Sequence, residues 1–173
     1  MAENTKNDEF MQEIATEAWK NLSEMFSWTE TLLEEYQDKV DWSRISKNRN
    51  IHWTIPMIRK FQNCIDWKDF SGYATEETLT ESVIATFRDK WNWQKLSENP
   101  GVILSFDLLD KFVDFWDWEE IIDRSSEIIF KEMGMEFYER YKERIPANLM
   151  PYSCLWYGIV YQMKRRLIAE IKA

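Results

Sequence analysis

The hexapeptide Asp66-Trp67-Lys68-Asp69-Phe70-Ser71 decides the fold, because close variants of it recur at a nearly constant interval. The variants are Asp41-Trp42-Ser43-Arg44-Ile45-Ser46, Asn92-Trp93-Gln94-Lys95-Leu96-Ser97 and Asp117-Trp118-Glu119-Glu120-Ile121-Ile122. Trp19, followed by Leu22 and Ser23, fits as an earlier copy without the acidic residue. The tryptophans at 19, 42, 67, 93 and 118 are spaced by 23, 25, 26 and 25 residues. A fixed period of this length is the signature of a tandem-repeat architecture.

Each repeat is predicted to form two short helices. In the first half, an Asp or Asn precedes the tryptophan and is a favourable N-cap, because its side-chain oxygen accepts a hydrogen bond from a first-turn backbone N–H. The second half, 54–61 in one copy, places an apolar pair and an aromatic residue on one helix face. Pro56 falls in the first turn, where its missing N–H costs nothing. The expected caps of the second helices are Thr29, Thr54, Thr80 and Ser105.

Helices this short are marginal alone, so the repeats must stack, and we expect each repeat to cover the tryptophan of its neighbour. The predicted fold is all-α: an α-solenoid-like stack of short helix pairs, in repeats of about 25 residues, with longer N- and C-terminal capping helices. We expect one domain, 1–173. Within it, 1–40 holds the N-terminal capping helix and a first degenerate repeat, 41–145 the tandem Trp repeats, and 146–173 the C-terminal capping helix.

Both capping helices have amphipathic patterns. The first is expected over about 8–26, and the apolar residues of one side are Phe10, Ile14, Ala18, Leu22 and Met25. The second is expected over about 152–172, and the residues predicted to face inward are Trp156, Ile159, Val160, Met163 and Leu167. Terminal helices of this kind cover the exposed ends of a repeat stack.

The stretch Trp91-Asn92-Trp93-Gln94-Lys95-Leu96-Ser97-Glu98-Asn99 carries a W-x-W-x-x-L-S-x-N pattern. Tandem units of this kind, over roughly 19–141, resemble the Trp-rich repeats of large DNA viruses, phages and bacteria. The Ser-x-Asn ending is retained in Ser46-Lys47-Asn48 but is lost after Phe70 and Ile121. The resemblance implies a helical repeat scaffold and brings no enzymatic residues with it.

The composition argues against several chemistries. A net charge of −9 repels phosphate backbones on average, which disfavours general nucleic-acid binding. The single histidine, His52, gives no basis for His-based acid–base catalysis or a multi-histidine metal site. The glycines are isolated and form no phosphate-binding loop. We therefore expect a non-enzymatic protein with no catalytic, cofactor-binding or metal-binding residues.

The sequence predicts a soluble cytoplasmic protein without membrane contact. Residues 1–9 are polar and acidic, unlike a targeting segment, and the most apolar stretch, 149–163, is interrupted by Pro151 and too short to cross a bilayer. Cys64 and Cys154 lie far apart and are expected to be buried thiols, which fits a reducing compartment.

Five bases and no acid occupy residues 42–61. This basic segment is either a solvated face that balances neighbouring acids or a docking patch for an acidic protein surface or a phosphate backbone. Protein docking is favoured over nucleic acid, because aromatic residues interleave the segment only at repeat positions. The candidate binding residues are Arg44, Lys47, Arg49, His52, Arg59 and Lys60.

The acidic pole is N-terminal, since residues 1–41 hold eleven acids and three bases. Glu9, Glu13 and Glu17 recur every four residues on one helix face, and Glu24 follows. These residues are candidates for contact with a basic partner surface. Separated acidic and basic poles steer association, and they permit head-to-tail self-association.

Two roles are open to the tryptophans, packing in the core and binding a ligand or partner. Their recurrence at fixed repeat positions predicts that Trp19, Trp42, Trp67, Trp93 and Trp118 pack in the core. Trp91 and Trp116, two positions before a repeat tryptophan, are expected to be partly exposed and to serve as interface aromatics.

A further acidic cluster, 114–123, could in principle hold a metal ion or transfer protons. Asp117 is better explained as an N-cap, and Glu119 and Glu120 as first-turn acids that complement the helix dipole.

Together these features favour a non-enzymatic protein-binding module. We hypothesise an inhibitor or immunity-type protein from a phage or a bacterial conflict system, with another protein as its partner. The alternatives are a nucleic-acid-associated protein that uses residues 44–60 and a metal-dependent enzyme that uses residues 114–123.

Overall fold

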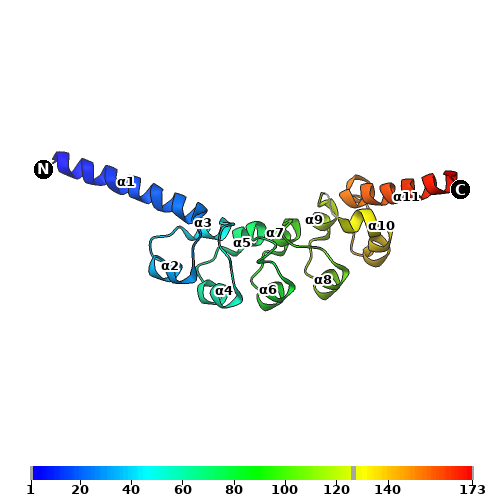
Figure 1. Cartoon of the computed structure of the whole chain (residues 1–173), viewed down its shortest axis with the longest axis horizontal. Helices are drawn as coiled ribbons and strands as arrows, with labels where there is room; N and C mark the ends of the chain where they lie inside the picture. The colour runs from blue at the N-terminus through cyan, green and yellow to red at the C-terminus, as the bar shows by residue number, and fades with distance from the viewer. Residues whose placement is uncertain (1, 126–127, 173) are drawn as a thin grey trace. The chain divides into compact units, whose positions relative to one another are not determined.

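The computed structural model describes residues 2–125 and 128–172, with side chains from residue 7 onward. Every regular element of this described part is a helix, which confirms the predicted all-α fold (Figure 1). The elements are α1 (Ala2–Met25), α2 (Glu30–Glu35), α3 (Trp42–Lys47), α4 (Ile55–Phe61), α5 (Trp67–Tyr73), α6 (Glu81–Thr86), α7 (Trp93–Glu98), α8 (Phe106–Lys111), α9 (Trp118–Asp123), α10 (Ile128–Tyr141), the 3-10 turn η1 (Met150–Tyr152) and α11 (Cys154–Lys172).

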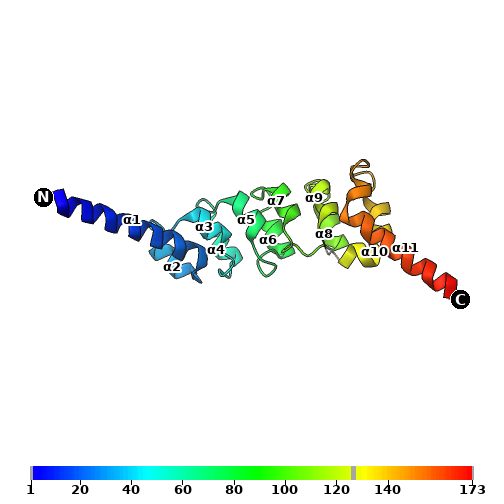
Figure 2. The ribbon, with the colours of Figure 1, turned by 90° about the horizontal axis from the view of Figure 1, so that it is seen from above.

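The chain divides into two compact parts, Met1–Asn92 and Trp93–Ala173, and the division falls directly before a repeat tryptophan. In the first part, the first helices of successive repeats, α1, α3 and α5, follow one another in a row, and α2, α4 and α6 form a second row (Figures 1 and 2). In the second part, α9 lies between α7 and α11, and α10 packs along α11. The first part is thus a two-row stack of helix pairs, and the second part continues the contact between successive first helices, α7, α9 and α11.

The helices begin where the sequence predicts, because polar side chains cap them. The hydroxyls of Thr29, Thr54, Thr80 and Ser105 each accept a hydrogen bond from the backbone N–H three residues later. The carboxylates of Asp41, Asp66 and Asp117 do the same for the helices that start at a tryptophan. These bonds satisfy backbone donors that a helix start otherwise leaves unpaired.

Each repeat tryptophan packs against the aromatic residue that ends the second helix of its own repeat. The ring centroids of Trp42 and Phe61 lie 5.3 Å apart, and their planes are inclined by 37°. Equivalent tilted pairs join Trp19 to Tyr36, Trp67 to Phe87, Trp93 to Phe112 and Trp118 to Tyr141. The tryptophans therefore fasten the two helices within a repeat, whereas we expected each to be covered by the neighbouring repeat. Trp118 is buried, and the other four are half-buried.

Buried serines join successive repeats. The hydroxyl of Ser46 donates to the carbonyl oxygen of Trp42 at 2.6 Å and accepts from the backbone N–H of Asp66 at 2.9 Å. Each such serine lies four residues after a repeat tryptophan, and its hydroxyl accepts a hydrogen bond from the backbone N–H that starts the next repeat. This bond recurs at three further positions: Ser23 to Asp41, Ser71 to Asn92, and Ser97 to Asp117. All four serines are buried.

The apolar faces of the two terminal helices differ from expectation. Both helices form, but the α1 side chains Phe10 and Met25 are 59% and 67% exposed, and Ile14 and Leu22 are also exposed. In α11, four of the five residues predicted to face inward are exposed: Trp156, Val160, Met163 and Leu167. Ile159 is half-buried. Both terminal helices pack on the neighbouring helix of their part, α1 on α3 and α11 on α9, as capping helices should. The prediction that Trp156, Val160, Met163 and Leu167 face inward is wrong.

The packing of α11 on α10 explains this orientation. The buried face of α11 consists of Leu155 and Gly158, not the larger apolar stripe. At Gly158 the backbone of α10 comes so close that a Cβ atom would lie 2.5 Å from the carbonyl oxygen of Phe130. Such a close approach requires a glycine face, so the bulky residues on the other side of α11 point away from α10.

The cysteines also differ from expectation. Both thiols are free, and Cys64 is exposed rather than buried, while Cys154 is half-buried. Burial, together with the nearby carboxylate of Asp123, raises the pKa of the Cys154 thiol. Within the described part of the chain, no helix combines the length and the apolar character that a bilayer crossing needs.

Candidate interaction surfaces

The basic segment of α3 and α4 is largely paired with acids of neighbouring repeats. The guanidinium of Arg44 contacts the Glu24 carboxylate at 2.6 Å, and the Lys47 ammonium lies 3.1 Å from the Asp69 carboxylate. Lys60 bridges two glutamates of α2, Glu30 at 3.1 Å and Glu34 at 2.7 Å. Hydrogen bonds to these acids raise the pKa of Lys47 and of Lys60. The segment is thus neutralised locally and does not form a continuous cationic patch.

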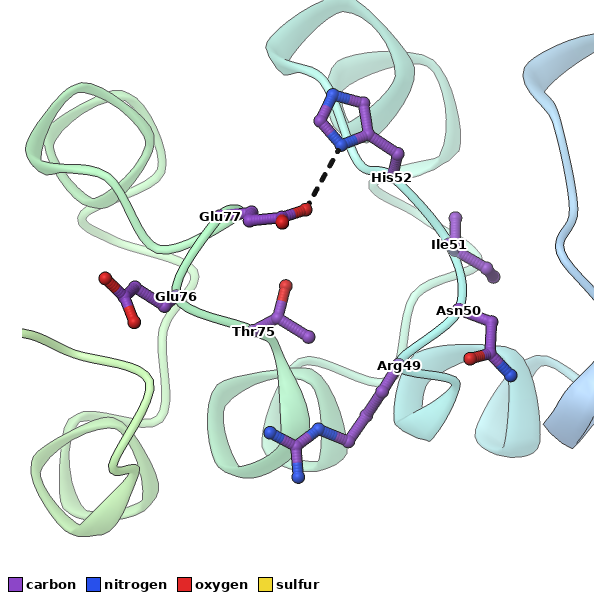
Figure 3. Close-up of a pocket in the computed structure, with 7 residues that line it drawn as sticks. All are labelled: Arg49, Asn50, Ile51, His52, Thr75, Glu76 and Glu77. Atoms are coloured by element: carbon purple, nitrogen blue, oxygen red, sulfur yellow. Dashed lines mark ion pairs between the residues drawn. The ribbon is translucent and has the colours of Figure 1, made fainter.

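Arg49 and His52 are placed differently, because both lie in the loop between α3 and α4. They line a shallow pocket of about 620 Å³ that faces the loop between α5 and α6 (Figure 3). Nδ1 of His52 points toward the Glu77 carboxylate across 3.7 Å. The remaining lining residues are Asn50, Ile51, Thr75 and Glu76. Arg59 lies apart on α4, exposed, with no ion pair to any residue that the structure describes.

The loop that carries Arg49 and His52 is held by asparagine side chains. The buried amide of Asn48 donates to the carbonyl oxygens of Ser23 and Phe26, both at 2.8 Å, and its oxygen accepts from the Asn50 backbone N–H. The Ser-x-Asn ending of the repeat therefore anchors this loop to the end of α1. The resulting pocket presents both charge signs, which suits contact with polar side chains of a partner more than capture of one anion.

Trp91 and Trp116 are buried, with 5% and 4% of their surfaces exposed, so the prediction that they are interface aromatics is wrong. Trp91 stacks on Phe70, and its indole N–H donates to the carbonyl oxygen of Ile84 at 3.1 Å. The same repeat position holds Val40 and Ile65, which are also buried. Two aliphatic residues in this position were the sequence signal that it belongs to the core.

Three residues of the acidic cluster 114–123 have structural partners. Asp114 pairs with Arg144 at 2.6 Å, Asp117 caps α9, and Glu120 accepts a hydrogen bond from Gln94 at 3.2 Å. Among residues 2–125 and 128–172, no three His, Cys, Asp or Glu side chains are grouped so that they could hold a metal ion. The cluster therefore gives the metal-dependent alternative no geometric support.

The outer half of α1 is an exposed amphipathic surface, because every side chain from residue 7 to residue 18 is exposed. Glu9, Glu13 and Glu17 form the predicted acidic row, in which Glu17 pairs with Lys20 at 3.5 Å, and Glu24 is paired with Arg44. Beside this row runs an apolar stripe, which we name the α1 stripe. Its residues are Phe10, Met11, Ile14, Ala18, Leu22 and Met25.

The α11 helix carries a second exposed apolar stripe, which includes four of the five residues that were predicted to face inward. We name it the α11 stripe, and its residues are Trp156, Val160, Met163, Leu167 and Ile171. Ile171 is 83% exposed. The charged residues of this helix are mainly basic: Lys164, Arg165, Arg166 and Lys172, with Glu170 as the acid. Arg165 reaches Glu132 at 3.6 Å, and Arg166 pairs with Glu170 at 3.0 Å.

Comparisons of the chain with family models, with curated proteins and with solved structures find no match. The resemblance to Trp-rich repeats of viruses, phages and bacteria therefore stays a prediction.

Proposed function

We propose that this protein is a non-enzymatic protein-binding module in which the stacked repeats hold exposed terminal helices for contact with another protein. The single observation that carries this proposal is the α1 stripe. Large contiguous apolar patches are uncommon on monomeric proteins and mark interaction surfaces. An amphipathic helix with anchors at three- and four-residue steps is also a recurring way to fill a groove on a partner.

The flanking charges specify the chemistry of the partner surface. Glu13 and Glu17 lie on the same helix as the α1 stripe, so a complementary groove would be apolar with a basic rim. An inhibitor or immunity-type role is a narrower form of this proposal, in which the acidic helix occupies the basic functional surface of an effector protein. A nucleic-acid role has less support, because acids of neighbouring repeats pair with Arg44, Lys47 and Lys60.

Affinity capture with the full-length protein tests the proposal. The bait is compared with the double variant Ile14→Glu, Leu22→Glu, which places two charges in the α1 stripe. The matched control, Gln12→Glu with Thr16→Glu, adds the same charge to exposed positions of α1 that lie beside the acidic row instead. We expect the natural protein and the control to retain a stoichiometric protein partner and the stripe variant to lose it. Equal capture by all three, or no stoichiometric partner for any, would refute the proposal.

A further inference from the structure

The α1 and α11 stripes are both exposed apolar helix faces, and their helices carry opposite net charges. We infer that the α1 stripe of one molecule docks on the α11 stripe of a second copy of this chain, which gives head-to-tail self-association. This inference rests on the proposed binding function of α1 and names its partner. The observations that carry it are the spacing of the exposed apolar residues and the opposite charges of the two helices.

The spacing of the two stripes suits helix-to-helix packing. In α1, Met11, Ile14, Ala18, Leu22 and Met25 recur at steps of three and four residues. In α11, Trp156, Val160, Met163, Leu167 and Ile171 follow the same rule. Residues at these steps stay on one helix face over successive turns, and such faces pair when the side chains of one fill the gaps of the other. Apart from the small Ala18, all are large apolar side chains that are exposed.

Charge selects the pairing of α1 with α11 over the pairing of either helix with itself. Ala2–Met25 contains six acids and two bases, so α1 has a net charge of −4. Cys154–Lys172 contains four bases and one acid, so α11 has a net charge of +3, of which Glu132 of α10 offsets one charge through its ion pair with Arg165. Two α1 helices or two α11 helices would bring like charges together, which costs free energy, whereas α1 and α11 attract.

A contact between two different surfaces has a distinctive consequence. Because α1 of one copy uses α11 of another, each dimer still has one free α1 and one free α11. Association therefore continues beyond the dimer, either as an open chain or until a ring closes. Screening by salt weakens the electrostatic part of the contact, while the apolar part remains.

Sedimentation velocity over a wide concentration range tests this inference with the full-length chain. The α1-blocked variant is Ile14→Glu, Leu22→Glu, and the α11-blocked variant is Val160→Lys, Leu167→Lys. Circular dichroism verifies that both remain helical, and Gln12→Glu with Thr16→Glu is the control. We expect the average mass of the natural protein and the control to rise past the dimer with concentration. Each blocked variant alone should stay monomeric.

Mixing the two blocked variants is the decisive step, because each retains one intact surface. We expect a one-to-one dimer and no larger species. A mixture that stays monomeric, or a natural protein that is monomeric at every concentration, would overturn the inference. If self-association is absent but the α1-blocked variant loses a partner protein that the natural protein captures, the proposed function still holds. A second outcome would also overturn the inference. If the protein does not self-associate but binds anionic vesicles, and Val160→Lys, Leu167→Lys abolishes this binding, the α11 stripe is a membrane-binding surface.

Discussion

Ser46 and Asp66 are linked by a hydrogen bond of 2.9 Å that joins one repeat to the next. The serine hydroxyl is the acceptor, and it donates in turn to the carbonyl oxygen of Trp42. Asp66 is engaged at both ends, since its carboxylate caps α5 by accepting from the N–H groups of Lys68 and Asp69. One residue pair therefore fixes the start of a helix and its register against the preceding repeat.

Replacement of Ser46 by alanine should destabilise the fold. The change removes the acceptor of the Asp66 N–H in a buried setting, and an unsatisfied buried donor costs about 1–3 kcal/mol. Ser43→Ala is the matched control, because the exposed Ser43 hydroxyl makes one surface hydrogen bond, to Asp69. We expect the control to change the free energy of unfolding by at most about 0.5 kcal/mol. Denaturant unfolding measures both, and equal effects would contradict a linking role for Ser46.

The repeat pattern was predictable because its determinants are local. A cap such as Thr54 or Asp66 bonds to backbone two or three residues away, so residue type and spacing suffice to locate the helix start. The linking role of Ser46 was not predicted, although serine recurs four residues after Trp19, Trp42, Trp67 and Trp93. That bond depends on the position of the next repeat, which local spacing does not reveal.

Trp91 and Trp116 occupy equivalent positions but differ in hydrogen bonding. The Trp91 indole N–H donates to Ile84, whereas Nε1 of Trp116 is buried without a hydrogen-bond partner in the described part of the chain. Replacement by phenylalanine removes a similar volume at both sites, but only Trp91→Phe breaks a bond. We expect Trp91→Phe to lower the free energy of unfolding by about 1 kcal/mol more than Trp116→Phe. Thermal or denaturant unfolding that ranks them the other way would contradict this assignment.

The close approach of α10 and α11 predicts that two glycine-to-alanine substitutions lower the free energy of unfolding by different amounts. In Gly158→Ala the new methyl group meets the backbone of Phe130, which cannot move aside, and overpacking of this kind costs about 1–3 kcal/mol. In Gly134→Ala it meets the side chain of Ile159 at 3.0 Å, which can shift. We expect Gly134→Ala to be the milder of the two in unfolding experiments, and similar losses would argue against the Gly158 contact.

The two thiols should react at different rates. Cys64 is exposed, whereas burial raises the pKa of Cys154 and lowers its thiolate fraction at any pH below that value. Because the thiolate is the nucleophile, an alkylating reagent at mildly alkaline pH should label Cys64 first. Raising the pH should increase the labelling of Cys154. Mass spectrometry of peptides from the folded protein measures the order, and faster labelling of Cys154 would show that α11 is not packed as described.

The terminal helices show where prediction from a single sequence ends. The period of Trp156, Val160, Met163 and Leu167 correctly indicates an amphipathic helix. It does not say what lies against the apolar side, and in α11 the small face of Gly158 meets α10 instead. An apolar helix face indicates that some surface covers it, but it does not identify that surface. The prediction failed because the α11 stripe does not face α10 and stays exposed in the single chain. In our account the covering surface belongs to another molecule.

Amide hydrogen exchange in α1 tests most directly whether its outer half is a binding surface. Short or uncovered helices are marginal in water, so in dilute protein the amides of residues 7–18 should exchange much faster than those of α3 and α5. At high protein concentration, residues 7–18 should become protected while α3 and α5 stay unchanged. Protection of residues 7–18 in dilute protein equal to that of α3, with no response to concentration, would contradict the account.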